Sequence, residues 1–229
     1  MRIAPAPDER PASDLTARAR IRDAAIECFA EQGFDATFRT IAGRAGVSPG
    51  LITHHFGSKD ALRAECDTEV LRQYTAYKTD AVDMPTDRLF QVMAAPGVTA
   101  SLMVYMLRVI GAGGQPAHAF LERLIDDARA VMAHAVETGL VRPSRDEEAR
   151  LRYLTYQTMG ALLVQFVTSP AMTPEAFIAH IQDPAFDQVL PTLELFTEGF
   201  LASPTMLDDY VAYRRQHAPA DADPQTRTG

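Results

Sequence analysis

The chain has no tryptophan, two cysteines and two lysines among its 229 residues. Two cysteines, Cys28 and Cys66, are too few for a disulfide framework or a four-thiolate zinc site. This scarcity favours a reducing, cytoplasmic setting. The first 13 residues hold three prolines and two acids where a secretory signal needs an apolar run, so we expect no signal peptide.

Long apolar runs are also scarce. Two uncharged stretches exist, residues 89–107 and 153–174, but Pro96-Gly97 breaks the first, and threonine and glutamine side chains interrupt the second. Both are too polar or too broken for a lipid-facing helix of about 20 residues. The sequence predicts buried helices and no membrane partner.

Acidic and basic residues are unevenly divided. The chain carries a net charge of −8, yet residues 1–63 hold 9 Lys and Arg against 8 Asp and Glu, while residues 64–229 hold 13 against 22. Such an asymmetry suggests two modules with different partners.

The apolar periodicity is helical nearly throughout, which predicts an all-α fold. We expect a disordered arm over 1–13, a helix-turn-helix domain over 14–63, a helical domain over 64–216 and a disordered tail over 217–229. The predicted helices cover about 16–32, 38–45, 49–56, 59–78, 86–95, 98–111, 117–139, 145–168, 174–181, 185–202 and 205–216.

The most informative segment is Ala45-Gly46-Val47-Ser48-Pro49-Gly50. Gly46 permits a sharp turn, Ser48 is a good N-cap, and Pro49 suits the first position of a helix. Gly57 limits that helix to about two turns, since each turn takes 3.6 residues. A short helix after a tight turn, with small polar residues at its start, predicts a helix-turn-helix.

These residues resemble the TetR family of transcriptional regulators. The resemblance covers residues 15–75 and rests on Phe29, Gly33-Phe34, Ile41-Ala42, Ala45 to Ser48, Gly50, His55-Phe56, Lys59 and Leu62. It implies a three-helix DNA-binding domain, a helical ligand-binding and dimerisation domain, and a homodimer on an inverted-repeat operator in double-stranded DNA. Members of the family are mostly repressors that a small molecule releases.

The resemblance also implies which residues contact DNA. They are Thr37, Arg39, Thr40, Arg44, Ser48, Pro49, Gly50, Thr53, His54 and Lys59. Two departures stand out. Thr53 occupies a position where the family usually has tyrosine, and the segment between Gly33 and Ile41 is one residue shorter than expected.

Catalytic and metal-binding patterns fail on inspection. Gly46 to Gly50 matches G-x-S-x-G, but the segment before Ser48 reads as helix, and Pro49 lacks the N–H that an oxyanion hole needs. His54 and His55 point about 100° apart on a helix, so they do not form a metal pair. We expect no enzyme activity, metal or cofactor.

Two apolar stripes fit helix–helix association, and we assign them to a dimer interface. They comprise Leu151, Leu154, Thr158, Leu162 and Phe166, and then Val189, Leu193, Phe196 and Phe200. A ligand pocket is predicted around Met93, Met103, Met106, Phe120, Met132, Tyr153, Tyr156 and Met159, because methionine adapts to varied shapes. Arg108, Arg123 and Arg129 are candidates for an anionic head group.

The sequence therefore predicts a DNA-binding regulator, a repressor released by a small and mostly apolar ligand. Two alternatives stay open at this point. One is a helical small-molecule-binding protein with a vestigial DNA-binding head, and the other is a hydrolase centred on Ser48. Neither the ligand nor the operator can be read from the residues.

Overall fold

The computed structural model describes residues 17–89, 99–168, 173–183 and 189–217. The chain forms two compact units, Met1–Asp183 and Pro184–Gly229. Every regular element among the described residues is a helix and none is a strand, which confirms the all-α class. None of the described helices is long and apolar enough to cross a membrane.

Three short helices open the first unit: α1 (Ala17–Gln32), α2 (Phe38–Ala45) and α3 (Pro49–Phe56). As the periodicity predicts, α1 buries Ile21, Ala25 and Phe29. Its first described residue, Ala17, follows the predicted arm, which lies outside the described residues. The bounds of α2 and α3 agree with the predicted ones because a cap residue stands at each N-terminus.

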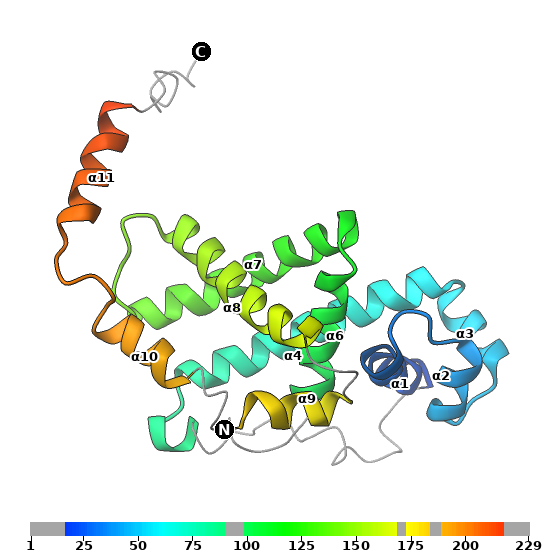
Figure 1. Cartoon of the computed structure of the whole chain (residues 1–229). Coiled ribbons are helices and arrows are strands. Elements are labelled where there is room, and N and C mark those ends of the chain that lie inside the picture. Colours follow the sequence, from blue (N-terminus) through cyan, green and yellow to red (C-terminus); the bar gives the residue numbers. More distant parts are fainter. Residues whose placement is uncertain (1–16, 90–98, 169–172, 184–188, 218–229) are drawn as a thin grey trace. The chain divides into compact units, whose positions relative to one another are not determined.

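Helix α4 (Lys59–Val82) is a continuous helix of 24 residues that follows α3. Its first half packs on α1 through the buried residues Leu62, Cys66 and Val70, and α4 also packs on α7 (Gly114–Glu137). Figure 1 shows it running from the α1–α3 group to the region below α7 and α8. The predicted end at Lys78 is one turn too early. The helix continues because no proline or glycine occurs between Gly57 and Pro85. The predicted domain boundary at 63 falls inside this helix.

A buried carboxylate ties α4 to α1. Glu69 is 7% exposed and accepts hydrogen bonds from Arg72 (2.7 Å) and Gln73 (2.7 Å), while Arg22 of α1 lies 3.5 Å away. Burial alone would raise the pKa of Glu69, but these partners outweigh it and lower the pKa. Nearby, Cys28 and Cys66 are free and buried, and burial raises the pKa of both thiols.

Helix α6 (Thr99–Gly111) forms the centre of the first unit, with contacts to α1, α4, α7, α8 (Glu147–Thr168) and α9 (Pro174–Ile181). Its Tyr105 ring meets Phe29 and Phe34 at centroid distances of 6.3 and 5.6 Å. Helix α7 starts three residues earlier than predicted, because Pro116 is tolerated in a first turn, where backbone N–H groups have no helical partner.

The second unit contains α10 (Val189–Thr197) and α11 (Thr205–Gln216), and neither helix has a buried residue. The bounds of α11 agree with the prediction. The predicted end of α10 at 202 is wrong, since the helix ends before Gly199, whose φ of +83° leaves the helical region. The predicted helix over 86–95 is described only over 86–89, and the predicted tail lies outside the description apart from His217.

Candidate nucleic-acid interface and ligand cavity

The turn between α2 and α3 is built from local signals. Thr37 caps α2 by accepting from the Thr40 N–H at 3.2 Å. Gly46 ends α2 with φ 66°, a left-handed conformation that favours glycine, and donates to the Ala42 carbonyl. Ser48 then caps α3 by accepting from the Leu51 N–H at 3.3 Å. The orientation of α3 relative to α2 is therefore determined by the backbone of the turn and its short capping side chains.

Helix α3 has one buried side and one exposed side. Its own side chains Ile52 and Phe56 are buried, and α3 packs on α1 and α4. Ser48, Pro49, Gly50, Thr53 and His54 are all exposed. The predicted DNA-contacting residues of α3 thus share the outward face, near its N-terminus.

The basic side chains around α3 fall into two groups. Arg44 forms ion pairs within the chain. Its guanidinium donates to both carboxylate oxygens of Glu31 at 2.7 and 2.6 Å and lies 3.5 Å from Glu27. Arg39 is exposed and Lys59 is half-buried, and among the described residues neither has an acidic partner. Two predicted cations are thus available for phosphate, while the third holds α2 on α1.

The remaining residues on the α2 side are polar and local. Thr37 and Thr40 have their hydroxyl oxygens 3.0 Å apart at the start of α2, with Thr37 exposed and Thr40 half-buried.

Arg18 of α1 lies over the Phe56 ring at 4.5 Å and donates to the His55 carbonyl at 2.5 Å. This arginine braces the C-terminal end of α3, a role that the sequence does not reveal.

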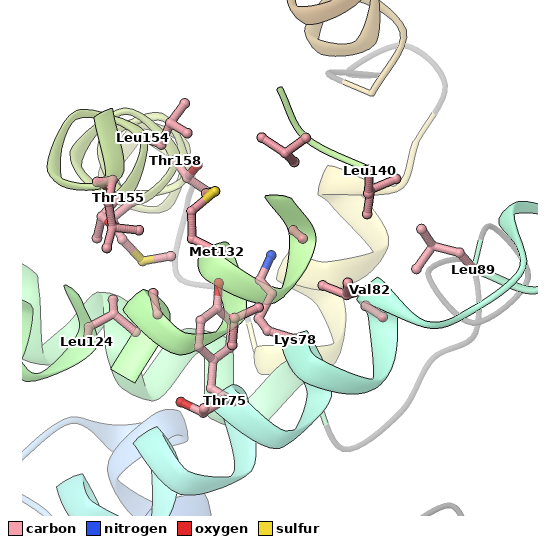
Figure 2. A pocket seen from close by; sticks show the side chains of 18 residues that line it. Thr75, Lys78, Val82, Leu89, Leu124, Met132, Leu140, Leu154, Thr155 and Thr158 are labelled. Atoms are coloured by element: carbon pink, nitrogen blue, oxygen red, sulfur yellow. The ribbon is translucent and has the colours of Figure 1, made fainter. Parts of the chain in front are cut away.

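A second feature is a cavity of about 350 Å³ in the first unit, lined by α4, α7, the residues after α7, and α8 (Figure 2). Most of the lining side chains are aliphatic. They include Val82, Leu124, Val131, Met132, Leu151 and Met159. A volume of this size lies at the lower end of the range for small-molecule sites. The cavity is therefore a candidate ligand site.

The seven predicted pocket residues that the structure describes fall into three groups. Met132 and Met159 line the cavity. Met106 and Phe120 are buried in the core and Met103 packs against it, so these three fill space within the helix bundle. Tyr153 and Tyr156 are 65% and 44% exposed and stand on the outer side of α8. Met93 lies outside the described residues.

The three arginines predicted for an anionic head group are engaged elsewhere. Arg108 donates to backbone carbonyls of α1, Arg123 donates to Thr68 at 3.0 Å, and Arg129 pairs with Asp126 and Glu148. The charged residue that does line the cavity is Lys78. A signal existed in the sequence: Tyr74, Lys78, Ala81 and Val82 follow helical spacing, so the lysine interrupts an apolar face.

The stripe on α8 predicted for a dimer interface faces the chain's own interior for the most part. Leu151, Leu154 and Thr158 line the cavity, and Leu162 and Phe166 pack against the core. The opposite face of α8 exposes Tyr153, Tyr156, Val164 and Val167, and nothing lies within 4 Å of the position of a Cβ on Gly160. In the second unit the predicted residues Val189, Leu193, Phe196 and Phe200 are exposed.

The described part of the chain supports neither a nucleophile elbow at Ser48 nor a metal site. Ser48 is an exposed helix cap next to Pro49, without the strand that a nucleophile elbow needs. Across residues 17–89, 99–168, 173–183 and 189–217, no group of three or more His, Cys, Asp and Glu side chains could hold a metal ion.

Comparison with known families covers both parts of the chain. Residues 21–66 match a family model described as bacterial regulatory proteins, tetR family. Residues 98–202 match one described as a tetracyclin repressor-like C-terminal domain. The two models together cover more than half of the chain.

Individual relatives agree with this. The transcriptional regulatory protein RaaS of Mycobacterium tuberculosis is 41% identical over 206 residues, which is 89% of this chain and 96% of that protein. The regulator BetI of Stenotrophomonas maltophilia is 42% identical over 59 residues, only 24% of this chain and 30% of that protein. Both relatives are transcriptional regulators.

Solved structures support the fold. The regulator FadR from Bacillus subtilis, solved in complex with stearoyl-CoA, matches with a TM-score of 0.52 and 19% identity over 80% of this chain and 98% of that one. The full-length relative and the two family models establish more than a shared fold, since they extend over the helix-turn-helix and the helical domain alike. This chain belongs to the TetR family of bacterial transcriptional regulators and is a DNA-binding regulator.

Proposed function

We propose that this regulator is a homodimeric repressor that a small, mostly apolar molecule releases from its operator by entering the cavity between α4, α7 and α8. The observation that carries the proposal is the course of α4. Lys59 begins this helix directly after α3, and Tyr74 and Lys78 of the same helix line the cavity. One helix therefore joins the DNA-binding surface to the ligand site.

The docking on DNA follows from the exposed side of α3. Ser48, Pro49, Gly50, Thr53 and His54 are exposed near the N-terminus of a helix, and a major groove about 12 Å wide admits such a helix. Thr37, Arg39, Thr40 and Lys59 flank this surface and contact phosphates. Arg44 acts through its ion pairs with Glu31 and Glu27, by holding α2 in place.

Release works by a shift between two arrangements of the dimer. Two recognition helices that read an inverted repeat must lie about 34–36 Å apart. A ligand that fits the cavity better when α4 is displaced favours another separation, and so competes with DNA through the same helix. The ligand needs no contact with the DNA-binding residues.

The outer face of α8 supplies the first part of the dimer surface. Tyr153, Gly160, Val164 and Val167 share that face, with two valines more than 60% exposed and room above the glycine for a partner helix. In the second unit, Leu193, Phe196 and Phe200 are exposed on and after α10. Large apolar side chains in such groups mark protein–protein surfaces. Each surface is buried by the second copy.

Selection of bound duplexes from fragmented genomic DNA of the source organism tests the proposal. The full-length protein at near-physiological salt should enrich an inverted repeat, which would support sequence-specific binding by a dimer. A folded, dimeric protein that enriches no sequence would overturn the repressor assignment, and would favour a ligand-binding protein with a vestigial head.

Variants then test the docking. Lys59→Ala should weaken binding to all sequences about equally, whereas His54→Ala should change preference at particular base pairs. Arg142→Ala, in the connection after α7, is the control and should bind as the wild type does. Because few cations face the DNA, the salt dependence should indicate release of fewer than about ten counterions. Wild-type affinity and selectivity in both test variants would refute the docking.

A further inference from the structure

We infer that the cavity binds an amphiphile with an anionic head, whose apolar body packs against α7 and α8 and whose acid group meets Lys78 of α4. The inference rests on the proposed function only in taking this cavity as the effector site. It goes further because it names the chemical class of the ligand and the residue that selects it.

The lining has one charge and a clear polarity. Lys78, an exposed residue at the edge of the cavity, is the only charged residue among the 18 described side chains that line it. The α7 and α8 walls are dominated by apolar side chains such as Leu124, Met132, Leu151 and Met159. In Figure 2 the Lys78 side chain rises from α4 with its nitrogen among the apolar lining side chains. The site therefore offers one cation to an otherwise apolar ligand.

The ammonium group of Lys78 contacts an aromatic ring but has no ion pair among the described residues. Its ammonium group lies 5.5 Å from the centre of the Tyr74 ring, a cation–π contact. Within the described ranges no carboxylate lies in ion-pair distance of it. The carboxylate of Asp83, at the end of α4, pairs with His134: Oδ1 of Asp83 lies 2.7 Å from Nε2 of His134. An unpaired ammonium group beside an apolar surface favours an anion and disfavours a cationic ligand.

Two threonines of the lining, Thr75 and Thr155, do not supply a second group for the head. Thr75 lies one turn before Lys78 on α4 and also lines the cavity, but in Figure 2 its hydroxyl oxygen points away from the Lys78 nitrogen. Thr155 is on the α8 wall, but its hydroxyl already donates to the Leu151 carbonyl at 3.0 Å. Lys78 therefore places the head group at the α4 side and the apolar body at the α7–α8 side.

Saturated carboxylates from hexanoate to dodecanoate are suitable probes, each used below its micelle concentration. Binding to the full-length protein without DNA is measured by calorimetry and by the shift in melting temperature. The matched ligands are 1-decanol and decyltrimethylammonium, which keep the apolar chain and change only the head. Decanoate should bind at least tenfold more tightly than either of them.

Variants at position 78 test the role of the lysine. Lys78→Met keeps the apolar stem and should lose at least tenfold in decanoate affinity with little change for decanol. Lys78→Arg should retain the preference for the acid. Arg20→Met, which removes an exposed positive charge from α1, is the control and should bind decanoate as the wild type does. Circular dichroism confirms that each variant is folded.

Three results would overturn the inference: no carboxylate binds, decanol or the ammonium compound binds as tightly as decanoate, or Lys78→Met binds decanoate normally. Operator binding is measured separately by fluorescence anisotropy. Lysine-dependent decanoate binding that leaves the operator complex intact would support the ligand class and refute ligand-controlled release. The two proposals therefore fail independently.

Discussion

Arg108 of α6 donates from its Nε to the carbonyl oxygen of Ala30, in the last turn of α1, at 2.6 Å. Its Nη2 donates to the next carbonyl, that of Glu31, at 3.0 Å. These acceptors lie at a helix C-terminus, where carbonyl groups lack helical partners and a positive charge is favourable. Burial lowers the pKa of Arg108, but such a group stays charged near neutrality. One side chain thus joins the central helix to the DNA-binding domain.

Replacing Arg108 should destabilise the first unit. Arg108→Met removes two charge-assisted hydrogen bonds, and hydrogen bonds to charged groups contribute about 1.5–3 kcal/mol each. We therefore expect the free energy of unfolding to fall by about 2 kcal/mol, which is within the range for one such bond. Arg108→Lys should lose less, since a lysine can still donate one bond. Urea titration followed by circular dichroism measures both, with Arg142→Met as the control. An unchanged urea midpoint in Arg108→Met would show that these bonds contribute nothing.

A second buried contact predicts a dependence on pH. The Tyr105 hydroxyl, on α6, donates to Asp67 Oδ1 of α4 at 2.7 Å. Burial raises the pKa of Asp67, while the Tyr105 bond and the charges of Arg63 and Arg123 lower it in part. An acid whose folded-state pKa is raised destabilises the fold as pH rises from about 4, its unfolded pKa, through the folded pKa.

Tyr105→Phe should widen that pH window. Loss of the hydrogen bond raises the folded-state pKa of Asp67 further, so the variant loses more stability than the wild type between pH 4 and pH 7. The deficit should be small near pH 4 and reach about 1–3 kcal/mol at neutrality, the cost of an unsatisfied buried group. Urea unfolding at several pH values measures it, with the exposed Tyr210→Phe as the control. A deficit that does not change with pH would refute this account of Asp67.

Ser48 has two roles that substitution can separate. Its oxygen caps α3, and its exposed position faces the proposed DNA. Ser48→Ala should lower the free energy of unfolding by about 0.5–2 kcal/mol, the usual cost of losing a cap. Ser48→Asp should keep the stability, because aspartate caps well and suits the positive end of a helix. Its negative charge should nonetheless weaken operator binding at least tenfold.

The matched control is Thr173→Asp. Thr173 caps α9 in the same way, by accepting from the Ala176 N–H at 3.2 Å, and α9 packs on α6 rather than on α2 or α3. Aspartate there adds the same charge at a helix cap and should leave operator affinity unchanged. Melting temperatures and fluorescence anisotropy give both readouts. Normal operator binding by Ser48→Asp would place Ser48 away from the phosphates.

Local signals in the sequence predicted much of this structure. Ser48 is a cap in both the prediction and the structure, because capping depends on residues only three positions apart. The helix 174–181 begins after the cap Thr173 with Pro174 in its first turn, and its bounds were predicted correctly. Family resemblance added the DNA-binding role, which helical periodicity alone does not reveal.

Long-range relationships could not be read in the same way. Helix α8 is apolar on both sides, with Leu151 and Met159 turned inward and Tyr153 and Val164 outward. The prediction assigned the stripe that contains Leu151 to a dimer interface, because periodicity does not say which apolar face packs within the chain. Arg108 likewise gives no sign in the sequence that its partners are carbonyl groups 77 and 78 residues away. Contacts of this kind depend on tertiary packing.

The outward stripe of α8 leads to the last prediction. Val164 is 61% exposed and shares its face with Gly160 and Val167. Val164→Glu places a charge where the dimer should bury an apolar side chain, and an unpaired buried charge is strongly unfavourable. The variant should sediment as a folded monomer and lose affinity for the inverted repeat, because each half-site then binds alone. Ala119→Glu, at an exposed position of α7, should remain dimeric. A dimeric Val164→Glu with normal operator affinity would move the interface away from this face.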